Sequence, residues 1–482
     1  MLNRRCSFLI AGSLLVFLAS AAGAQTPPPP PDGLHTTPSL YWQEGPQRVD
    51  LGLYVRSRVE WWDAYATETD SFVGTRARVR LSYGWAGKLL LVGEVQAQRL
   101  DSMEETGTGA IATYRAANNN QYEADGVDMR LLFAELRPVE GAWLRLGRQE
   151  VKLGSEVLYP EPDWRYLKAA RVGERLVGTV GWSHVERSYD GASGSWDLGG
   201  HTLYGFLAGP TTGVFTADDA YDIQHDIAVG GLSWTVERGA WLPNTELSLF
   251  ALDYEDDRNP SRGGLPGGDG VHVTAVGAHS VGVYPLGPGK ADLLLWAAGQ
   301  GGRYDGVNHQ AWAALAEAGY QWPDCFAKPW LRAGVNVASG DSNPADDDHT
   351  TFFNVLPTNH LYYGFADQLA FQNLLNPFVQ LRLAPHPMLG VNLFVHWFRL
   401  MDEDDSRYSG TGAATRNAFG FAAQDPGGER DVGTEYDVVL TFTPHRTVTF
   451  ETGFSWLDGG DVFRGRPDRD VGFGYVSLEL RY

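Results

Sequence analysis

Five arginines occur at every second position in two neighbouring segments close to the N-terminal end of the chain. Arg56 and Arg58 lie in the first segment, and Arg76, Arg78 and Arg80 lie in the second. Side chains two residues apart share one face of a β-strand. Guanidinium groups stay charged and bind carboxylates through two parallel hydrogen bonds. The spacing therefore predicts a cationic strand face, which either attracts an anionic solute or is neutralised by acids on the same face.

Both interpretations of this face stay open from the sequence. Glu60 and Glu94 are the acids nearest to the five arginines on the same face. For any single arginine, an ion pair that braces the wall of the protein is the simpler explanation, whereas for the five together the two explanations are balanced. The polar strand faces add a further set of charges: Arg332, Arg382, Glu435, Asp437 and Glu451.

No residue pattern in the sequence indicates catalysis. The motifs of metalloproteases, serine hydrolases, dinucleotide sites and phosphate-binding loops do not occur, and histidines such as His184 and His396 are isolated. Acidic clusters at 255–257, 346–348 and 402–405 offer carboxylates of the kind that bind calcium. None has EF-hand spacing, and solvated loop charge is the simpler interpretation. We therefore expect no enzymatic activity, no cofactor and no metal.

The elements that would position the charged residues are β-strands. From position 51 the sequence alternates, with Leu51, Leu53 and Val55 on one face and Tyr54 and Arg56 on the other. Segments of about ten residues match the length of a tilted strand that crosses a membrane. The pattern predicts about 18 strands (16–18), at residues 51–62, 75–84, 89–99, 129–137, 143–150, 177–187, 196–208, 228–237, 244–254, 271–285, 290–300, 310–322, 329–338, 374–384, 389–400, 434–443, 447–457 and 472–482.

Connections between the predicted strands alternate in length. Short turns rich in Gly or Pro, such as those near 85–88 and 385–388, alternate with long polar loops, such as those near 209–226 and 401–433. This asymmetry is typical of outer-membrane barrels. We therefore predict an all-β fold, a single transmembrane antiparallel β-barrel with short periplasmic turns, long extracellular loops and both termini in the periplasm. A barrel of this size encloses an aqueous lumen.

The two ends of the chain carry targeting features. Residues 1–24 have the positive start, apolar stretch and small-residue cleavage site, near Ala24, of a secretory signal peptide. Residues 25–50 form a Pro-rich spacer, and residues 51–482 form the barrel. The last strand ends on the aromatic Tyr482, an ending that resembles that of outer-membrane proteins and implies recognition by the barrel-assembly machinery. We expect the protein in the outer membrane of a Gram-negative cell, in contact with lipid and lipopolysaccharide.

The composition of the chain excludes some partners. It has 59 acidic and 38 basic residues, for a net charge of −21, and no block of basic residues. Nucleic acid is not an expected partner, because its phosphates require a basic surface. Cys325 is the only cysteine after the signal peptide, so an intrachain disulfide is not expected.

Several short motifs occur in a fixed order along the chain. They are Leu-Gly-Arg-Gln-Glu at 146–150, Glu-Arg-Leu-Val-Gly at 174–178 with Trp182, Arg187, Tyr189, Asp190 and Gly191, Pro-Thr-Asn-His-Leu-Tyr-Tyr-Gly at 357–364 with Asp367, Gly-Thr-Glu-Tyr-Asp at 433–437, and Gly-Gly-Asp at 459–461. In these segments the chain resembles the alginate export family of outer-membrane channels. The resemblance implies an 18-stranded barrel that passes a polyuronate outward through an electropositive constriction.

The resemblance also carries over site residues. It implies pathway roles for Arg130, Arg148 and Asp190. The chain departs from the family at Glu150, where family members have a second arginine, and at Glu451, near which they have paired arginines. The family's arginine-bearing loop is replaced here by one with His360 and Asp367. The scaffold is therefore better supported than the substrate.

The leading functional hypothesis is a passive outer-membrane channel for an anionic polysaccharide or oligosaccharide, alginate-like, with an arginine-lined lumen. A general or differently selective porin on the same scaffold is the alternative. An outer-membrane enzyme ranks lower, because no nucleophile and base are found together. The predicted pathway residues are Arg56, Arg58, Arg76, Arg78, Arg80, Arg130, Arg148, Asp190, Arg332, Arg382 and Glu451.

Overall fold

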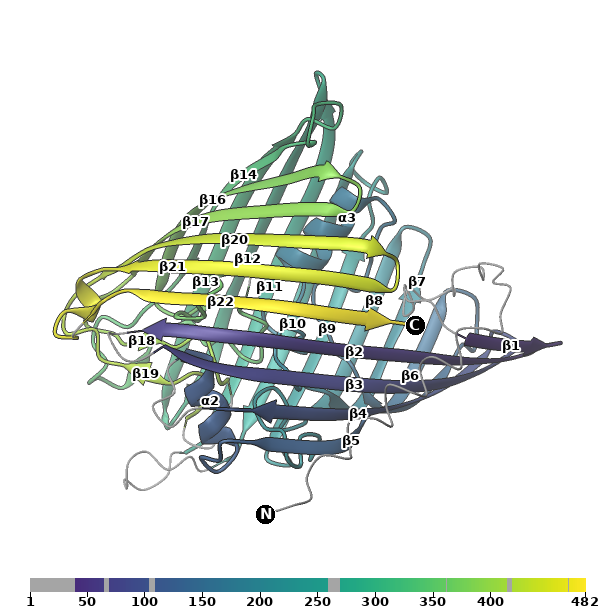
Figure 1. Ribbon diagram of the computed structural model, residues 1–482, viewed down its shortest axis with the longest axis horizontal. Helices are drawn as coiled ribbons and strands as arrows, with labels where there is room; N and C mark the ends of the chain where they lie inside the picture. The colour runs from purple at the N-terminus through teal and green to yellow at the C-terminus, as the bar shows by residue number, and fades with distance from the viewer. Residues whose placement is uncertain are drawn as a thin grey trace, which may run out of the picture.

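The protein is a closed antiparallel barrel of 18 strands, which confirms the predicted fold class (Figure 1). The computed structural model describes residues 40–64, 69–103, 109–258, 269–360, 362–413, 418–466 and 468–482. Strand β22 closes the ring by pairing with β2 from Tyr54↔Arg481 to Ala64↔Val471. The barrel strands are β2 (Gln47–Ala64), β3 (Asp70–Trp85), β4 (Leu89–Asp101), β5 (Ala124–Leu136), β6 (Ala142–Gln149), β7 (Tyr189–Asp197), β8 (His201–Pro210), β9 (Ile227–Val236), β10 (Thr245–Asp256), β11 (Val271–Leu286), β12 (Gly289–Tyr304), β13 (Val307–Gln321), β14 (Trp330–Ala338), β16 (Leu374–His386), β17 (Leu389–Leu400), β20 (Asp431–His445), β21 (Val448–Gly459) and β22 (Val471–Arg481).

The outer face of the barrel is apolar, as period-two alternation requires. Leu207 and Leu232 in the middle of neighbouring strands are 67% and 68% exposed, which only a lipid environment accommodates at no cost. Exposed aromatic rings lie toward both ends of the strands, in the arrangement of interfacial girdles: Trp85, Trp196 and Trp241 near the short turns, and Trp312, Trp397 and Trp456 near the long connections.

One predicted strand is wrong. Residues 177–187 are not in the wall but in the long connection 150–188, and the strand that follows is β7. The predicted strand consists mostly of small and apolar residues, but it also contains the adjacent charged residues Glu186 and Arg187. In a strand these two side chains would point to opposite faces, so one charge would face the lipid. The next predicted strand, 196–208, is replaced by β8, and the total number of strands is unchanged.

Pairing at the start of the barrel begins earlier than predicted. Strand β2 begins at Gln47, and a short strand β1 (Leu40–Glu44) pairs with it. Strand β1 starts at Leu40↔Leu51, next to the point where Tyr482 ends its own pairing with Leu53. The division into signal peptide, spacer and barrel stays a prediction, and residues 1–39 lie outside the described residues.

Two long connections fold into the barrel instead of standing above it. The connection 150–188 contains helix α3 (Pro162–Leu167) and a π-helical turn, η1 (Lys168–Val172), and the connection 339–373 contributes buried aromatic residues such as Phe353 and Phe371. Part of the space inside the barrel, predicted to be an aqueous lumen, is therefore packed by chain. The helices of the described residues include none that is long and apolar enough to cross a bilayer.

Smaller elements also occur in the connections on the same side. They are α2 (Gly109–Ala117), β15 (Asp348–His349), which is parallel to β13, the pair β18 (Arg407–Tyr408) and β19 (Ala423–Gln424), and η2 (Asp461–Phe463).

The lipid-facing assignment predicts a depth-dependent cost of charge. We expect Leu232→Arg to lower the free energy of unfolding by about 2–4 kcal/mol, because it places a cation at mid-membrane. Leu286→Arg, at the exposed periplasmic end of β11, is the matched control with an expected cost of about 0–1 kcal/mol. Denaturant unfolding in lipid vesicles measures both, and equal effects would contradict the assignment.

Candidate solute pathway

The two inward connections meet across the lumen and form one layer, residues 150–188 and 351–373, here called the lumen layer. The backbone of Leu356 receives a hydrogen bond from Gly178 N–H at 2.9 Å and donates one to Leu176 at 2.8 Å. The rings of Trp182 and His360 stack with centroids 3.8 Å apart. These contacts make the two segments a single structural unit inside the barrel.

The lumen layer is fixed to one wall by buried ion pairs. Arg171 contacts Glu317 of β13 at 2.7 Å, and Lys168 pairs with Glu246 of β10. Arg332, predicted to line the pathway, contacts the same Glu317 at 2.8 Å and is fully buried. Arg332 therefore braces the layer and does not face the solute route.

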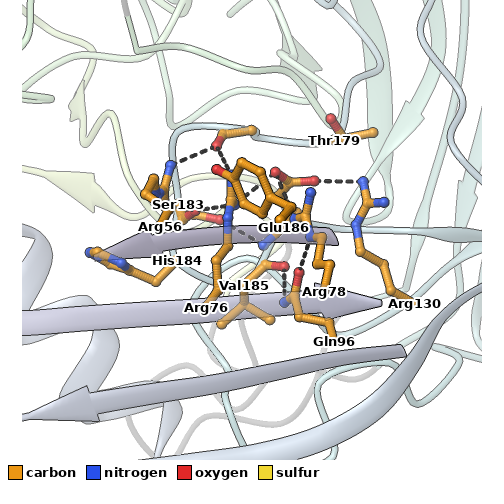
Figure 2. A network of polar contacts seen from close by, with 12 residues as sticks. Arg56, Arg76, Arg78, Gln96, Arg130, Thr179, Ser183, His184, Val185 and Glu186 are labelled. Atoms are coloured by element: carbon orange, nitrogen blue, oxygen red, sulfur yellow. Dashed lines mark hydrogen bonds and ion pairs between the residues drawn. The ribbon is translucent and has the colours of Figure 1, made fainter. Parts of the chain in front are cut away.

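The opposite wall holds the layer through its backbone (Figure 2). Arg56 and Arg76 donate hydrogen bonds to the carbonyl oxygen of Ser183 at 2.6 and 2.9 Å. Gln96 donates to the carbonyl of Val185 at 2.8 Å. Two of the arginines predicted to attract solute thus use some of their N–H groups in hydrogen bonds to the backbone of the lumen layer.

Glu186 is the acid on which the arginine cluster converges. Its carboxylate lies 2.7 Å from Arg76, 2.9 Å from Arg78 and 2.6 Å from Arg130. Figure 2 shows the side chains of this cluster. Burial by itself favours the neutral acid, but the arginines hold the pKa of Glu186 well below its usual range. Arg130 also pairs with Glu94 at 2.5 Å. Most of the cluster is neutralised, and the neutralising acid comes from a segment that was predicted to be wall.

The neighbouring His184 packs against Gly74 of β3, at a position where only glycine fits. A Cβ on Gly74 would lie 2.0 Å from His184 Nδ1, so the layer and β3 approach closely only because that side chain is absent. Burial and the nearby Arg58 lower the pKa of His184 to about 3, so the ring is neutral. Arg58 itself pairs with Glu60 at 2.5 Å and lies 3.6 Å from the ring centre of Trp182.

On the periplasmic side of the layer lies a large cavity of about 950 Å³, here called the vestibule. A second cavity of about 390 Å³ shares the lining residues Glu174 and Gly181 with it. Across the layer, a space of only about 30 Å³ shares Trp182 and His360 with the vestibule. The interior is therefore wide on the periplasmic side of the layer, and the Trp182–His360 stack, which we call the constriction, lies between the vestibule and the small space.

The predicted pathway residues fall into three groups. Arg130 and Arg332 are buried between the wall and the lumen layer. Arg148 and Asp190 are a correction: they pair with each other at 2.7 Å on the outer face, beside the exposed Leu132, and do not line the lumen. The other seven line the two cavities: Arg56, Arg58, Arg382 and Glu451 the vestibule, and Arg76, Arg78 and Arg80 the second cavity.

Sequence reasoning missed the residues that the lumen layer brings to the route, chiefly Trp182, Glu186 and Tyr166. Two features of the sequence could have indicated that this segment is not a strand of the wall. The charged residues Glu186 and Arg187 are adjacent, and residues of the family motif lie within the predicted strand 177–187. Within the described residues, no three histidine, cysteine or acidic side chains are arranged to hold a metal.

The convergence on Glu186 predicts that the layer depends on this carboxylate. We expect Glu186→Gln to lower the free energy of unfolding by about 3–5 kcal/mol, because it leaves buried arginines undercompensated, and to raise the single-channel conductance. Glu123→Gln removes an exposed acid of the loop before β5 and should change stability by less than about 0.5 kcal/mol. Equal conductance in wild type and Glu186→Gln would contradict the role of Glu186.

The lowered pKa of Glu186 also sets a pH dependence. A carboxyl with a depressed folded-state pKa contributes stability above its unfolded pKa and loses that contribution only as the pH falls through the folded value. We therefore expect the conductance of the wild type to stay constant between about pH 7 and about pH 4 and to rise only at lower pH. Recordings in planar bilayers across this range measure it, and a rise near pH 6 would be the contrary result.

Comparison with known proteins shows which family the chain belongs to and which solved structures its fold resembles. A model of the alginate export family matches residues 47–476. The fold resembles the outer membrane protein OpdK of Pseudomonas aeruginosa (TM-score 0.54, 11% identity, 90% of this chain and 99% of that chain covered), OccK2 (OpdF) of the same organism in complex with glucuronate (0.57, 10%, 90% and 97%) and OccAB4 of Acinetobacter baumannii (0.56, 9%, 90% and 98%). No curated protein gives a significant sequence match. Because the family match spans nearly the whole barrel, the chain belongs to the alginate export family and is an outer-membrane channel.

Proposed function

We propose that the channel passes an anionic saccharide, alginate-like in its carboxylates, by passive diffusion. The observation that carries the proposal is the pair of adjoining periplasmic cavities whose lining includes six of the predicted arginines. A carboxylate that leaves bulk water needs replacement hydrogen bonds, which guanidinium groups supply in a bidentate geometry. One similar structure contains glucuronate and another vanillate, both carboxylates, and these ligands support the class of solute by analogy.

The balance of charge favours moderate selectivity. The vestibule is lined by the cations Arg56, Arg58, Lys290, Lys328 and Arg382 and by the acids Asp163, Glu174, Glu451 and Glu479. The acids leave only a small excess of cations in the vestibule. For that reason a general or differently selective porin is the second candidate. A general porin would show no preference for acidic over neutral sugars, whereas a channel for anionic saccharides would.

The remaining expectations about the chain join this proposal. We propose a transport role without catalysis, removal of residues 1–24 on secretion, contact with lipopolysaccharide on the outer leaflet, and recognition of the C-terminal strand by the barrel-assembly machinery. The support for the last point is that Tyr482 is placed at the barrel seam, where its backbone pairs with Leu53 of β2.

Bilayer electrophysiology tests the solute class. We expect a pore with mild anion selectivity whose current is reduced by trigalacturonate and not by the neutral maltotriose, because only the acidic trisaccharide engages the lining arginines. Cation selectivity, or equal block by both trisaccharides, would favour the general porin. Sugar uptake into liposomes that contain the purified protein provides a measurement independent of current.

A further inference from the structure

Arg382 differs from the other arginines of the barrel interior in its surroundings. It lies on β16 and lines the vestibule. Its guanidinium carbon is 3.6 Å from the ring centre of Tyr166, which belongs to α3, and 5.3 Å from the ring centre of Trp330 on β14. Among the described residues, the guanidinium of Arg382 makes neither an ion pair nor a hydrogen bond. The interactions of this guanidinium are with aromatic faces.

A comparison with Arg332 on the adjacent strand shows what this means. Arg332 contacts Asp292 at 3.0 Å and Glu317 at 2.8 Å, so its charge is neutralised inside the protein. Arg382 has an aromatic platform instead of acids. Stacking covers the flat face of a guanidinium and leaves its five N–H donors, which lie in the plane of the group, for another partner.

The platform under Arg382 is held rigidly. The hydroxyl of Tyr166 accepts a hydrogen bond from Gln380 at 2.5 Å, and the Trp330 indole donates to Asp292 at 2.7 Å. The two rings meet edge to face with centroids 5.3 Å apart. A cation fixed in this way loses little conformational freedom when it binds, which favours recognition of a small anion.

We propose that Arg382, on its platform of Tyr166 and Trp330, is a binding subsite for a sugar carboxylate in the periplasmic vestibule. Lys328, an exposed cation in the turn before β14 that also lines the vestibule and has no ion pair among the described residues, adds to the local field. The subsite lies on the periplasmic side of the constriction, so an outward-moving solute meets it first. This inference rests on the proposed function and names one place where the solute binds.

Binding to the full-length protein in detergent tests the subsite, with trigalacturonate as the probe and isothermal titration calorimetry as the readout. We expect Arg382→Gln to weaken binding about 10-fold or more, because it removes a charge-assisted contact. Arg137→Gln removes an arginine at the same end of the barrel that pairs with Glu135 and does not line the vestibule. It should change the affinity by less than about 2-fold.

A second pair of variants tests the platform without changing charge. Tyr166→Phe keeps the ring and should retain binding within about 3-fold, whereas Tyr166→Leu removes it and should weaken binding toward the level of Arg382→Gln. Loss of binding in a Tyr166 variant could also result from unfolding of the barrel. Heat-modifiable gel mobility is therefore recorded for each variant to confirm that the barrel is folded.

The outcomes separate the subsite from the channel. If trigalacturonate binds and blocks the wild type and Arg382→Gln equally, the subsite is overturned and the solute class stands. If Arg137→Gln weakens binding as much as Arg382→Gln, the effect is one of general charge and the subsite is likewise overturned. If the wild type neither binds nor is blocked, the proposed function fails and the subsite with it.

Discussion

The contact between Glu186 and the three arginines Arg76, Arg78 and Arg130 is the interaction on which the interior depends. It joins the wall strands β3 and β5 to a segment that would otherwise be an extracellular loop, and Gln96 of β4 adds a hydrogen bond to the neighbouring carbonyl of Val185. Buried charges of this kind are stable only as complete networks, because a missing partner leaves an uncompensated charge. The wall and the lumen layer therefore determine each other.

The lumen layer divides and partly fills the space inside the barrel. A ring of 18 strands by itself encloses an aqueous space. The stacked Trp182 and His360 narrow this space at one level, and the vestibule remains wide on the periplasmic side. Backbone strain is concentrated in the same segment, where Glu174, Val180 and Glu186 adopt positive φ angles that other residue contacts must hold in place.

The charge distribution separates arginines that build the interior from arginines that face the route. The charges of Arg332 and Arg130 are neutralised by buried acids. Substitution of either arginine would therefore lower the stability of the protein before it changed the charge of the cavities. Arg382 lines the vestibule, and its guanidinium lies over aromatic rings and makes no ion pair among the described residues. A count of inward arginines therefore does not measure the charge that faces the cavities, because acids of the protein neutralise several of them.

The sequence by itself determined the wall. Period-two alternation, strand length and the alternation of short and long connections are local properties, so the 18-stranded barrel could be predicted and is confirmed. In the structure Arg56, Arg76 and Arg382 line the interior cavities. The route through the barrel was decided only by the tertiary structure. Glu186 meets Arg76 across more than one hundred residues of chain, and Arg148 faces outward although a family motif suggested otherwise. Such contacts form when an irregular segment folds back across the lumen, and no periodicity in the sequence encodes that return.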